Sequence, residues 1–353
     1  MEADGNLRGR ATITDVAERS GTSIKTVSRV FNDEPFVRPA TRTRVLQAAA
    51  ELDYHPNIAA RSLVRGRSFL IGLFYENPSP NYVVDLQTGS LDRLEGERFR
   101  LLLFPCQSAK AMSGKLLQLA RASALEGVVL APPLGDDPQT VKELIEARMP
   151  FVRIAPTTAL DASPGVGIDD VAAARTMTEH LLELGHRRIA FVQGDPNYPS
   201  NSQRLDGFHK ALSNAAVPFD EQLLEQGFYT FESGLAAGRR LFANRARPTA
   251  VFAANDDMAA GVCVAAKEYG LDIPGNVSIA GFDDSLISRV IWPQLTTIHQ
   301  PTYDMAHVAT GALLSLINKT PVEPAVCLPH RLIVRSSTAE APGVGSTTRV
   351  RSL

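Results

Sequence analysis

The hydrophobic positions of this chain follow two different periods. Up to about residue 52 they recur every three or four positions, the spacing of amphipathic helices. From residue 69 onward, short apolar runs alternate with amphipathic stretches: FLIGLFY (69–75), RLLLFP (100–105), GVVLAP (127–132), PFVRIA (150–155), RIAFVQG (188–194), TAVFAAN (249–255) and VSIAGFD (277–283). Runs of this kind are typical of strands buried on both faces, and their alternation with helices predicts parallel sheets. We therefore expect a helical domain followed by an α/β body with too many strands for one small sheet.

The helical segment carries the signals of a helix-turn-helix. Thr12 can cap a first helix, and Asp15, three residues on, can complete a capping box. Gly21 falls where a tight turn needs positive φ, and Ser23 can cap a second helix over 24–31. A third helix is predicted to begin near Pro39 and to cover the other two with its apolar positions, Val45, Leu46, Ala49 and Leu52.

The second helix is polar on its outward side. Hydroxyl, amide and cationic groups of this kind suit phosphates and base edges, whereas a three-helix bundle without a DNA role, the alternative, does not usually collect them on so short a helix. The residues are Ser23, Lys25, Thr26, Ser28, Arg29 and Asn32.

A basic segment, HPNIAARSLVRGRS (55–68), follows the third helix. Pro56 should end that helix, and Asn57 can cap a short helix over 58–64 that is too short to be stable alone. Leu63 stands among arginines, which suits insertion of an apolar wedge into the minor groove. The alternative is an ordinary linker.

The run TITDVAERSGTSIKTVSRVFN, followed by PNIAARSL, resembles the lactose-repressor/galactose-repressor family of bacterial transcription regulators. The resemblance implies that Ile24, Lys25 and Arg29 meet base edges in the major groove. It also implies phosphate contacts from Thr12, Ser23, Thr26, Ser28 and Asn32, and a hinge helix that includes Asn57, Ala60 and Leu63.

The resemblance extends over about residues 11–338, through HLLELGHRRIAFVQG, QRLDGF, FESG, PTAVFAANDDMAAG, VSIAGFDD and LTTIHQP. It implies two doubly wound subdomains of the periplasmic-binding-protein type, joined by three crossovers, with a ligand between them. The expected organisation is a DNA-binding domain over 1–56, a hinge over 57–67, a first subdomain over 68–168 plus 299–328, a second over 169–298 plus 329–339, and a disordered tail over 340–353.

Polar residues at strand ends indicate a binding site in this body. Asn255 and Asp283 each follow an apolar run, and ligands of such folds bind at the carboxyl ends of strands. The alternative is that they only cap the next helices. The resemblance adds Arg204, and the three side chains together suit a polyol. Further candidates are Tyr82, Ser200, Tyr229 and Gln300.

Arg153 is an arginine inside the apolar run PFVRIA, on the same face as Ala155. Some sugar-binding members of the resembled family carry an acid where this chain has Ala155. A buried arginine needs a partner. Two interpretations stay open: a structural pair with Asp169 or Asp170, or a contact to an anionic ligand such as a sugar acid or sugar phosphate.

Composition narrows the choice of function. The chain has 353 residues and a formal charge of −2, but residues 1–67 hold 11 Lys and Arg against 8 Asp and Glu, a net of +3. The N-terminus lacks the apolar run of a signal peptide, and no apolar run is long enough to span a membrane. The three cysteines, Cys106, Cys263 and Cys327, suit small buried apolar positions in a reducing compartment.

These features predict a cytoplasmic DNA-binding regulator and not an enzyme, since the sequence holds no P-loop, no G-x-S-x-G, no H-E-x-x-H and no clustered metal ligands. We expect a homodimer on a palindromic operator, released by a small-molecule effector, most simply a carbohydrate, with no cofactor and no membrane partner. The alternatives are a regulator that needs a nucleobase or similar co-repressor, and a solute-binding protein.

Overall fold

The computed structural model describes residues 11–31, 34–54, 67–76, 79–244 and 246–342. The chain divides into an N-terminal unit, residues 1–68, and a C-terminal unit, residues 69–353, and each is described by itself. Among the described helices, none is long and apolar enough to cross a membrane.

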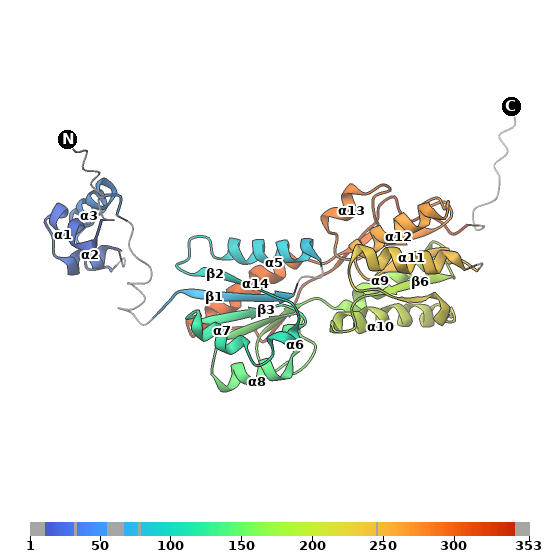
Figure 1. Cartoon of the computed structure of the whole chain (residues 1–353), viewed down its shortest axis with the longest axis horizontal. Coiled ribbons are helices and arrows are strands. Elements are labelled where there is room, and N and C mark those ends of the chain that lie inside the picture. The colour runs from blue at the N-terminus through green and yellow to red at the C-terminus, as the bar shows by residue number, and fades with distance from the viewer. Residues whose placement is uncertain (1–10, 32–33, 55–66, 77–78, 245, 343–353) are drawn as a thin grey trace, which may run out of the picture. The chain divides into compact units, whose positions relative to one another are not determined.

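The described part of the N-terminal unit is a three-helix bundle (Figure 1). Its helices are α1 (Ile13–Ser20), α2 (Ile24–Phe31) and α3 (Pro39–Glu51). The predicted capping box is present, because Thr12 and Asp15 each bond the other's main-chain N–H, and Gly21 ends α1 at φ 62°. Ser23 Oγ accepts from Thr26 N–H at the start of α2 (3.2 Å). The predicted helix-turn-helix is therefore confirmed element by element.

The small core of this unit differs from the prediction in the third helix. Val16, Ala17, Val27 and Val30 pack against α3 as expected. Leu46, which we predicted to cover the other helices, is 47% exposed. Ala48, two residues further along on the inward side of α3, lies in the core instead, since a small residue allows the three short helices to approach closely.

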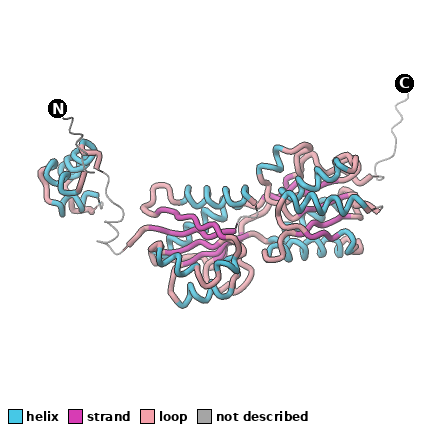
Figure 2. The backbone as a smooth tube through the Cα atoms, viewed as in Figure 1, coloured by secondary structure: helices cyan, strands magenta, loops and turns pink. Residues whose placement is uncertain are grey.

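The first subdomain of the C-terminal unit is built on a six-stranded parallel sheet in the order β11-β5-β4-β3-β1-β2. Its strands are β1 (Leu70–Glu76), β2 (Arg100–Cys106), β3 (Gly127–Leu130), β4 (Phe151–Ile154), β5 (Gly165–Gly167) and β11 (Ala325–Cys327). Helices α5 (Pro80–Arg93) and α14 (Thr302–Ile317) cover one face, and α7 (Leu116–Ala122) and α8 (Pro138–Glu146) the other, with the short α6 (Ala109–Met112) and the 3-10 turn η1 (Leu134–Asp136) beside them (Figures 1 and 2).

The second subdomain has a four-stranded parallel sheet in the order β7-β6-β8-β9. Its strands are β6 (Ile189–Gln193), β7 (Leu224–Gln226), β8 (Ala250–Ala253) and β9 (Ser278–Ala280). Helix α9 (Asp170–Glu183) packs on α10 (Pro199–Asn214), and α11 (Phe231–Ala243) packs on α12 (Asp256–Glu268). The turn η2 (Glu221–Leu223) and the short helix α13 (Leu286–Val290) complete it.

The chain passes between the subdomains more than once, because some of its last helices and strands belong to the first subdomain and some to the second. β10 (Thr297–His299) pairs with β12 (Arg331–Ile333) beside the second sheet, whereas α14 and β11, which lie between them in sequence, belong to the first. Residues at the start of the predicted tail remain packed: Ala341 is buried and its N–H donates to Leu184 O (2.8 Å). The rest of that tail, from residue 343, lies outside the described residues.

Candidate functional site

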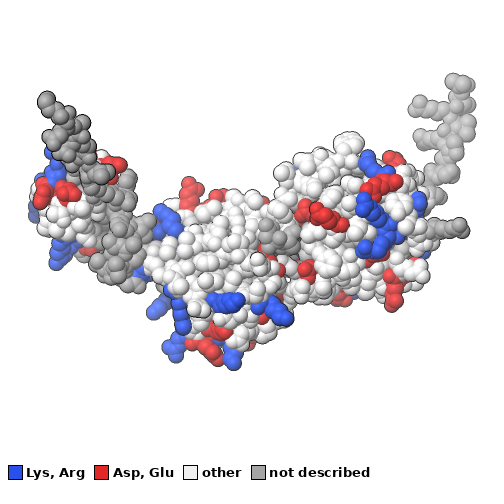
Figure 3. Space-filling model, viewed as in Figure 1, with Lys and Arg blue, Asp and Glu red and all other residues white. Residues whose placement is uncertain are grey.

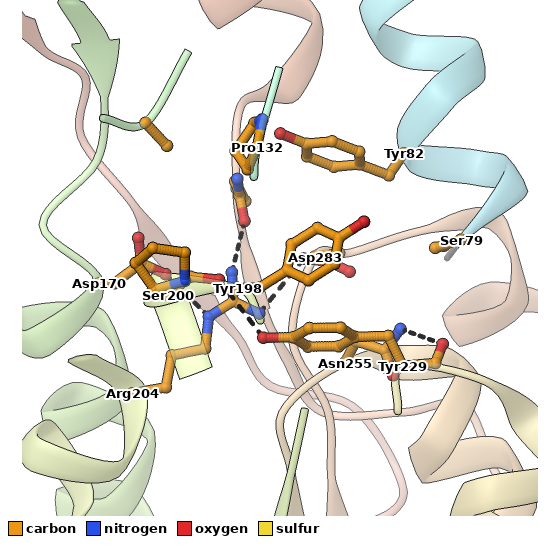
Figure 4. A pocket seen from close by; sticks show the side chains of 13 residues that line it. Ser79, Tyr82, Pro132, Asp170, Tyr198, Ser200, Arg204, Tyr229, Asn255 and Asp283 are labelled. Atoms are coloured by element: carbon orange, nitrogen blue, oxygen red, sulfur yellow. Dashed lines mark hydrogen bonds and ion pairs between the residues drawn. The ribbon is translucent and has the colours of Figure 1, made fainter. Parts of the chain in front are cut away.

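A pocket of about 570 Å³, open mouth included, lies where the two subdomains meet (Figure 4). The first subdomain supplies Ser79, Tyr82, Pro132 and Ala155; the second supplies Asp170, Tyr198, Pro199, Ser200, Arg204, Tyr229, Asn255 and Asp283; Gln300 comes from the segment that connects β10 to α14.

Arg204 on α10 is the centre of the polar network. Its Nε donates to Asp170 Oδ1 (2.8 Å), and its other nitrogens donate to Ala254 O (2.6 Å) and Gln300 Oε1 (3.0 Å). The guanidinium also stacks on the Phe282 ring, 3.6 Å from its centroid. Burial alone would lower the pKa of Arg204, but the neighbouring carboxylate of Asp170 holds it above its ordinary value. The arginine is therefore charged and almost fully engaged by the protein itself.

Asp283 differs, because its carboxylate keeps free acceptors. It lies 3.9 Å from Arg204 Nη1, beyond hydrogen-bond distance, and no protein hydrogen bond to either oxygen is found within the described part of the chain. Burial raises the pKa of Asp283 well above its ordinary value, and Arg204 opposes that rise. Its φ of 107° is sparsely populated by residues other than glycine. A strained backbone thus holds an unsatisfied acceptor at the pocket wall.

Asn255 combines the two roles that the sequence left open. It is the N-cap of α12, where its Oδ1 accepts from Met258 N–H (3.0 Å). Its Nδ2 donates to Tyr229 O (2.9 Å), so the amide also holds the tyrosine segment in place. It caps a helix and lines the pocket at once.

Aromatic rings form the other walls. Tyr229, at φ 62°, lies edge-on to Tyr198 with centroids 5.5 Å apart, and its hydroxyl is 3.3 Å from Ser200 Oγ. A side chain at Gly194 would collide with the Tyr229 ring, since a Cβ there would lie 2.0 Å from it. Figure 4 shows Tyr82, on α5, on the side opposite Arg204 and Tyr229. The pocket therefore offers both hydrogen-bonding edges and flat apolar faces.

Two hydrogen bonds join the subdomains beside this pocket. Ser79 Oγ donates to Asp257 (2.7 Å), and Tyr198 O–H donates to Glu76 (3.2 Å), which also accepts from Ala109 N–H. Burial raises the pKa of Glu76, while these hydrogen bonds oppose the rise. The two contacts join the first subdomain to the second beside the pocket.

The structure brings together seven of the eight residues predicted for the ligand site: Tyr82, Ser200, Arg204, Tyr229, Asn255, Asp283 and Gln300. Arg153 is the exception. It is fully buried and donates to Ser163 Oγ and to the carbonyls of Gly135, Thr158 and Ala159, and it does not line the pocket. Of the two interpretations left open, the structural role holds but with other partners, because Asp169 caps α9 and Asp170 pairs with Arg204.

Sequence reasoning missed Ser79, Pro132, Asp170, Tyr198 and Pro199 as lining residues. Asp170 and Tyr198 follow the carboxyl ends of β5 and β6, so the rule that found Asn255 and Asp283 could also have found them. The cysteine expectation was wrong in part: Cys263 is buried, but Cys106 is half-buried and Cys327 is exposed.

The predicted DNA-binding residues of the N-terminal unit are mostly accessible. Thr12, Ser23, Ile24, Lys25 and Arg29 are exposed, and Thr26 and Ser28 are half-buried. Arg29 lies 3.4 Å from Glu34, a weak exposed ion pair. Asn32, Asn57, Ala60 and Leu63 lie outside the described residues. On the face of the C-terminal unit drawn in Figure 3, acidic and basic side chains are interspersed, which is unlike a nucleic-acid surface.

The comparisons with known proteins agree with this architecture. Residues 12–57 match the model of the bacterial regulatory proteins of the lacI family, and residues 178–338 match that of a periplasmic binding protein-like domain. Catabolite control protein A of Priestia megaterium is 32% identical over 329 residues, 93% of this chain and 99% of that protein. The chain therefore belongs to the lacI family of bacterial transcription regulators.

Solved structures lead to the same family. The lac repressor dimer bound to operator and the anti-inducer ONPF matches with a TM-score of 0.83 at 29% identity, over 94% of this chain and 100% of that one. A complex of the transcriptional regulator CelR with cellobiose matches with a TM-score of 0.70 at 31% identity, over 93% and 100%. These relatives are regulators and not enzymes.

Proposed function

We propose that this protein is a repressor that binds a palindromic operator as a homodimer and is released when an uncharged carbohydrate fills the pocket between its subdomains. The observation that carries the proposal is a polar, tyrosine-lined pocket in the same chain as a helix-turn-helix with an accessible second helix. Its family and the operator-bound and sugar-bound relatives support it. We place its action in the bacterial cytoplasm, on the nucleoid.

The charge of the pocket favours an uncharged ligand. Arg204 is its one cation among the described lining residues, and three protein acceptors already occupy that guanidinium. Asp283 adds a carboxylate with free acceptors, which suits hydroxyl donors and repels a second carboxylate or a phosphate. Tyrosine rings can pack against the C–H face of a sugar. With Arg153 outside the pocket, the argument for an anionic effector loses its basis.

A ligand screen tests this function. The full-length protein would be heated with neutral sugars, sugar acids, sugar phosphates and nucleobases, and operator binding would be measured with each ligand that raises Tm. We expect a neutral sugar to raise Tm and to lower operator affinity. Stabilisation by a nucleobase together with tighter operator binding would favour the co-repressor alternative.

The coupling to DNA requires only a modest free energy. Pocket residues and two hydrogen bonds join the subdomains, so a ligand that prefers one arrangement shifts the equilibrium by its differential affinity. Coupling free energies of about 1–3 kcal/mol are typical of allosteric proteins. A hinge helix over 58–64, predicted from sequence to be unstable alone, would respond to a change of that size.

Replacing Lys25 with alanine is expected to reduce specific DNA binding about 10- to 100-fold, the effect of losing a side chain that contacts a base edge. The operator would first be selected from randomised palindromic duplexes, and affinities would be measured by fluorescence anisotropy at several salt concentrations. Affinity of the unmodified protein should fall steeply with salt, by roughly one log–log unit per phosphate contacted.

The matched control is Lys110→Ala, which replaces an exposed lysine on α6 of the C-terminal unit. It should leave operator affinity unchanged. If Lys25→Ala weakened binding to random duplexes as much as to the operator, Lys25 would contact phosphates and not bases.

The proposed dimer has a candidate surface in the C-terminal unit. Val290 and Trp292 at the end of α13 are 68% and 78% exposed, and Val84 and Leu91 on α5 are also exposed. Burial raises the pKa of Asp85 on α5, and the charges of His299 and of Arg289 on α13 oppose that rise. Exposed apolar patches usually mark interfaces, and the lac repressor relative is a dimer. A second copy of this chain is the occupant that we propose.

Val290→Asp is therefore expected to turn the dimer into a monomer, because a buried unpaired carboxylate would oppose association. Sedimentation velocity measures the change, and operator affinity should fall with it. Ile145→Asp, also at an exposed apolar position, on α8 of the opposite sheet face, serves as the control and should stay dimeric. A dimeric Val290→Asp variant would exclude this surface.

A further inference from the structure

A second hollow, of about 630 Å³ with its mouth included, opens at the edge of the six-stranded sheet. We call it the outer hollow. It lies among the loop after β4, the strands β5 and β11, and the start of α9 and α10. Its lining residues outside the pocket include Pro156, Thr157, Gln203, Pro324, Val326 and Cys327.

The outer hollow adjoins the pocket. Ala155 and Asp170 line both. Ala155 contributes only a methyl group at this junction, and its φ of 45° turns the chain away from the end of β4. A longer side chain at residue 155 would stand between the two spaces. The two spaces therefore share part of their lining.

The chemistry of the outer hollow matches a sugar ring. Pro156, Pro324 and Val326 offer an apolar wall. The Thr157 hydroxyl, the Gln203 amide and the Asp170 carboxylate, one oxygen of which is held by Arg204, offer hydrogen-bonding groups. The described lining includes no Lys or Arg. As in the pocket, the combination suits an uncharged ligand with hydroxyl edges and a flat C–H face.

The room for a ligand also extends beyond the inner pocket. The outer hollow is a separate space that shares Ala155 and Asp170 with the inner pocket. We propose that the effector is an uncharged glycoside of at least two units, with one unit in the inner pocket and the next in the outer hollow. This inference rests on the proposed function and names the size of its ligand.

The first test compares sugars of different length by calorimetry on the full-length protein. The probes are glucose, galactose, xylose and arabinose, the disaccharides cellobiose, maltose, lactose, melibiose and xylobiose, and the corresponding trisaccharides. We expect the tightest ligand to be a di- or trisaccharide, at least tenfold tighter than its component monosaccharides. A monosaccharide that binds as tightly as every longer sugar containing it would overturn the proposal, as would no binding by any of these sugars.

These outcomes separate the two proposals. A monosaccharide that binds as tightly as the longer sugars and releases the operator would support the proposed function. It would exclude binding of a second sugar unit in the outer hollow. If no sugar of any length bound and the operator complex were insensitive to all of them, the proposed function itself would fail.

Gln203→Ala gives a second test, because Gln203 lines the outer hollow and not the inner pocket. It should weaken binding of the best disaccharide about tenfold and that of its monosaccharide less than twofold. Gln222→Ala, an exposed glutamine of the same subdomain, should alter neither. Equal losses for both sugars would mean that Gln203 acts on the fold and not on the second unit.

Cys327 supplies a probe that needs no mutation. It is exposed and lines the outer hollow, whereas Cys263 is buried and Cys106 is only half-accessible. The rate at which N-ethylmaleimide modifies Cys327, followed by mass spectrometry, should fall at least fivefold with saturating disaccharide and stay unchanged with saturating monosaccharide. An unchanged rate with the disaccharide would contradict occupancy of the outer hollow.

Discussion

Asp283→Asn is expected to abolish the response to effector while operator affinity stays the same. The carboxylate has no hydrogen-bond partner within the described part of the protein, so its acceptors are available to ligand hydroxyls. Hydrogen bonds to a charged group contribute about 1.5–3 kcal/mol each. Loss of the charge should therefore weaken the effector about 10- to 100-fold per hydroxyl bound. Calorimetry with the tightest sugar, and anisotropy with the operator, measure the two effects.

Asparagine is preferred to alanine at residue 283 because the φ of 107° would strain most other residues. Burial raises the pKa of Asp283, so effector affinity of the unmodified protein should fall as pH is lowered through that raised pKa, when the carboxylate gains a proton. The Asn variant should lack this pH dependence. A variant that still responded at ordinary effector concentrations would show that the pocket is misplaced.

Arg204→Met is expected to lower the free energy of unfolding of the C-terminal unit by about 3–5 kcal/mol and to remove effector binding. The substitution leaves Asp170 buried and unpaired, which is the costly way to break a buried ion pair. It also deprives Ala254 O and Gln300 of their donor. Urea unfolding followed by circular dichroism measures the stability.

The double variant Arg204→Met/Asp170→Ala separates stability from binding. Replacing both members of a buried ion pair by apolar groups is often close to neutral, so most of the lost stability should return. Effector binding should not return, because both lining groups are gone. Recovery of binding along with stability would mean that Arg204 only supports the fold.

Local signals were sufficient where the fold depends on neighbours in sequence. The capping box at Thr12 and the turn at Gly21 are contacts over a few residues, and both are confirmed. The long apolar runs predicted the central strands. The pattern missed β5, β7, β10, β11 and β12. Each is three residues long, and so few residues show no periodicity; β7 and β11 are edge strands, and β5 is next to the edge.

In the binding site too, some residues had a signal in the sequence and others did not. Asn255 and Asp283 could be found because parallel strands gather their carboxyl ends at one edge. Arg153 was misjudged since a buried arginine suggests a carboxylate partner, whereas the chain at 158–163 folds over it and supplies carbonyls and a hydroxyl. Hydrogen bonds to main-chain carbonyls cannot be predicted from residue types, because every residue has a carbonyl. Leu46 was misplaced for a different reason: Val45, Leu46, Ala48 and Ala49 are close together in α3, so apolar side chains point to more than one side of the helix.

Both subdomains line the pocket, and this affects how long a ligand stays bound. Tyr82 approaches from one side and Tyr229 from the other, while Ser79 and Tyr198 bridge the two. Under the proposed function, a sugar held by both subdomains would leave more readily when they part, so the rate of that opening would influence its residence time. The time for which the controlled genes stay active after the nutrient is exhausted would then depend on how fast the two subdomains separate. A stronger Ser79–Asp257 hydrogen bond would prolong that time.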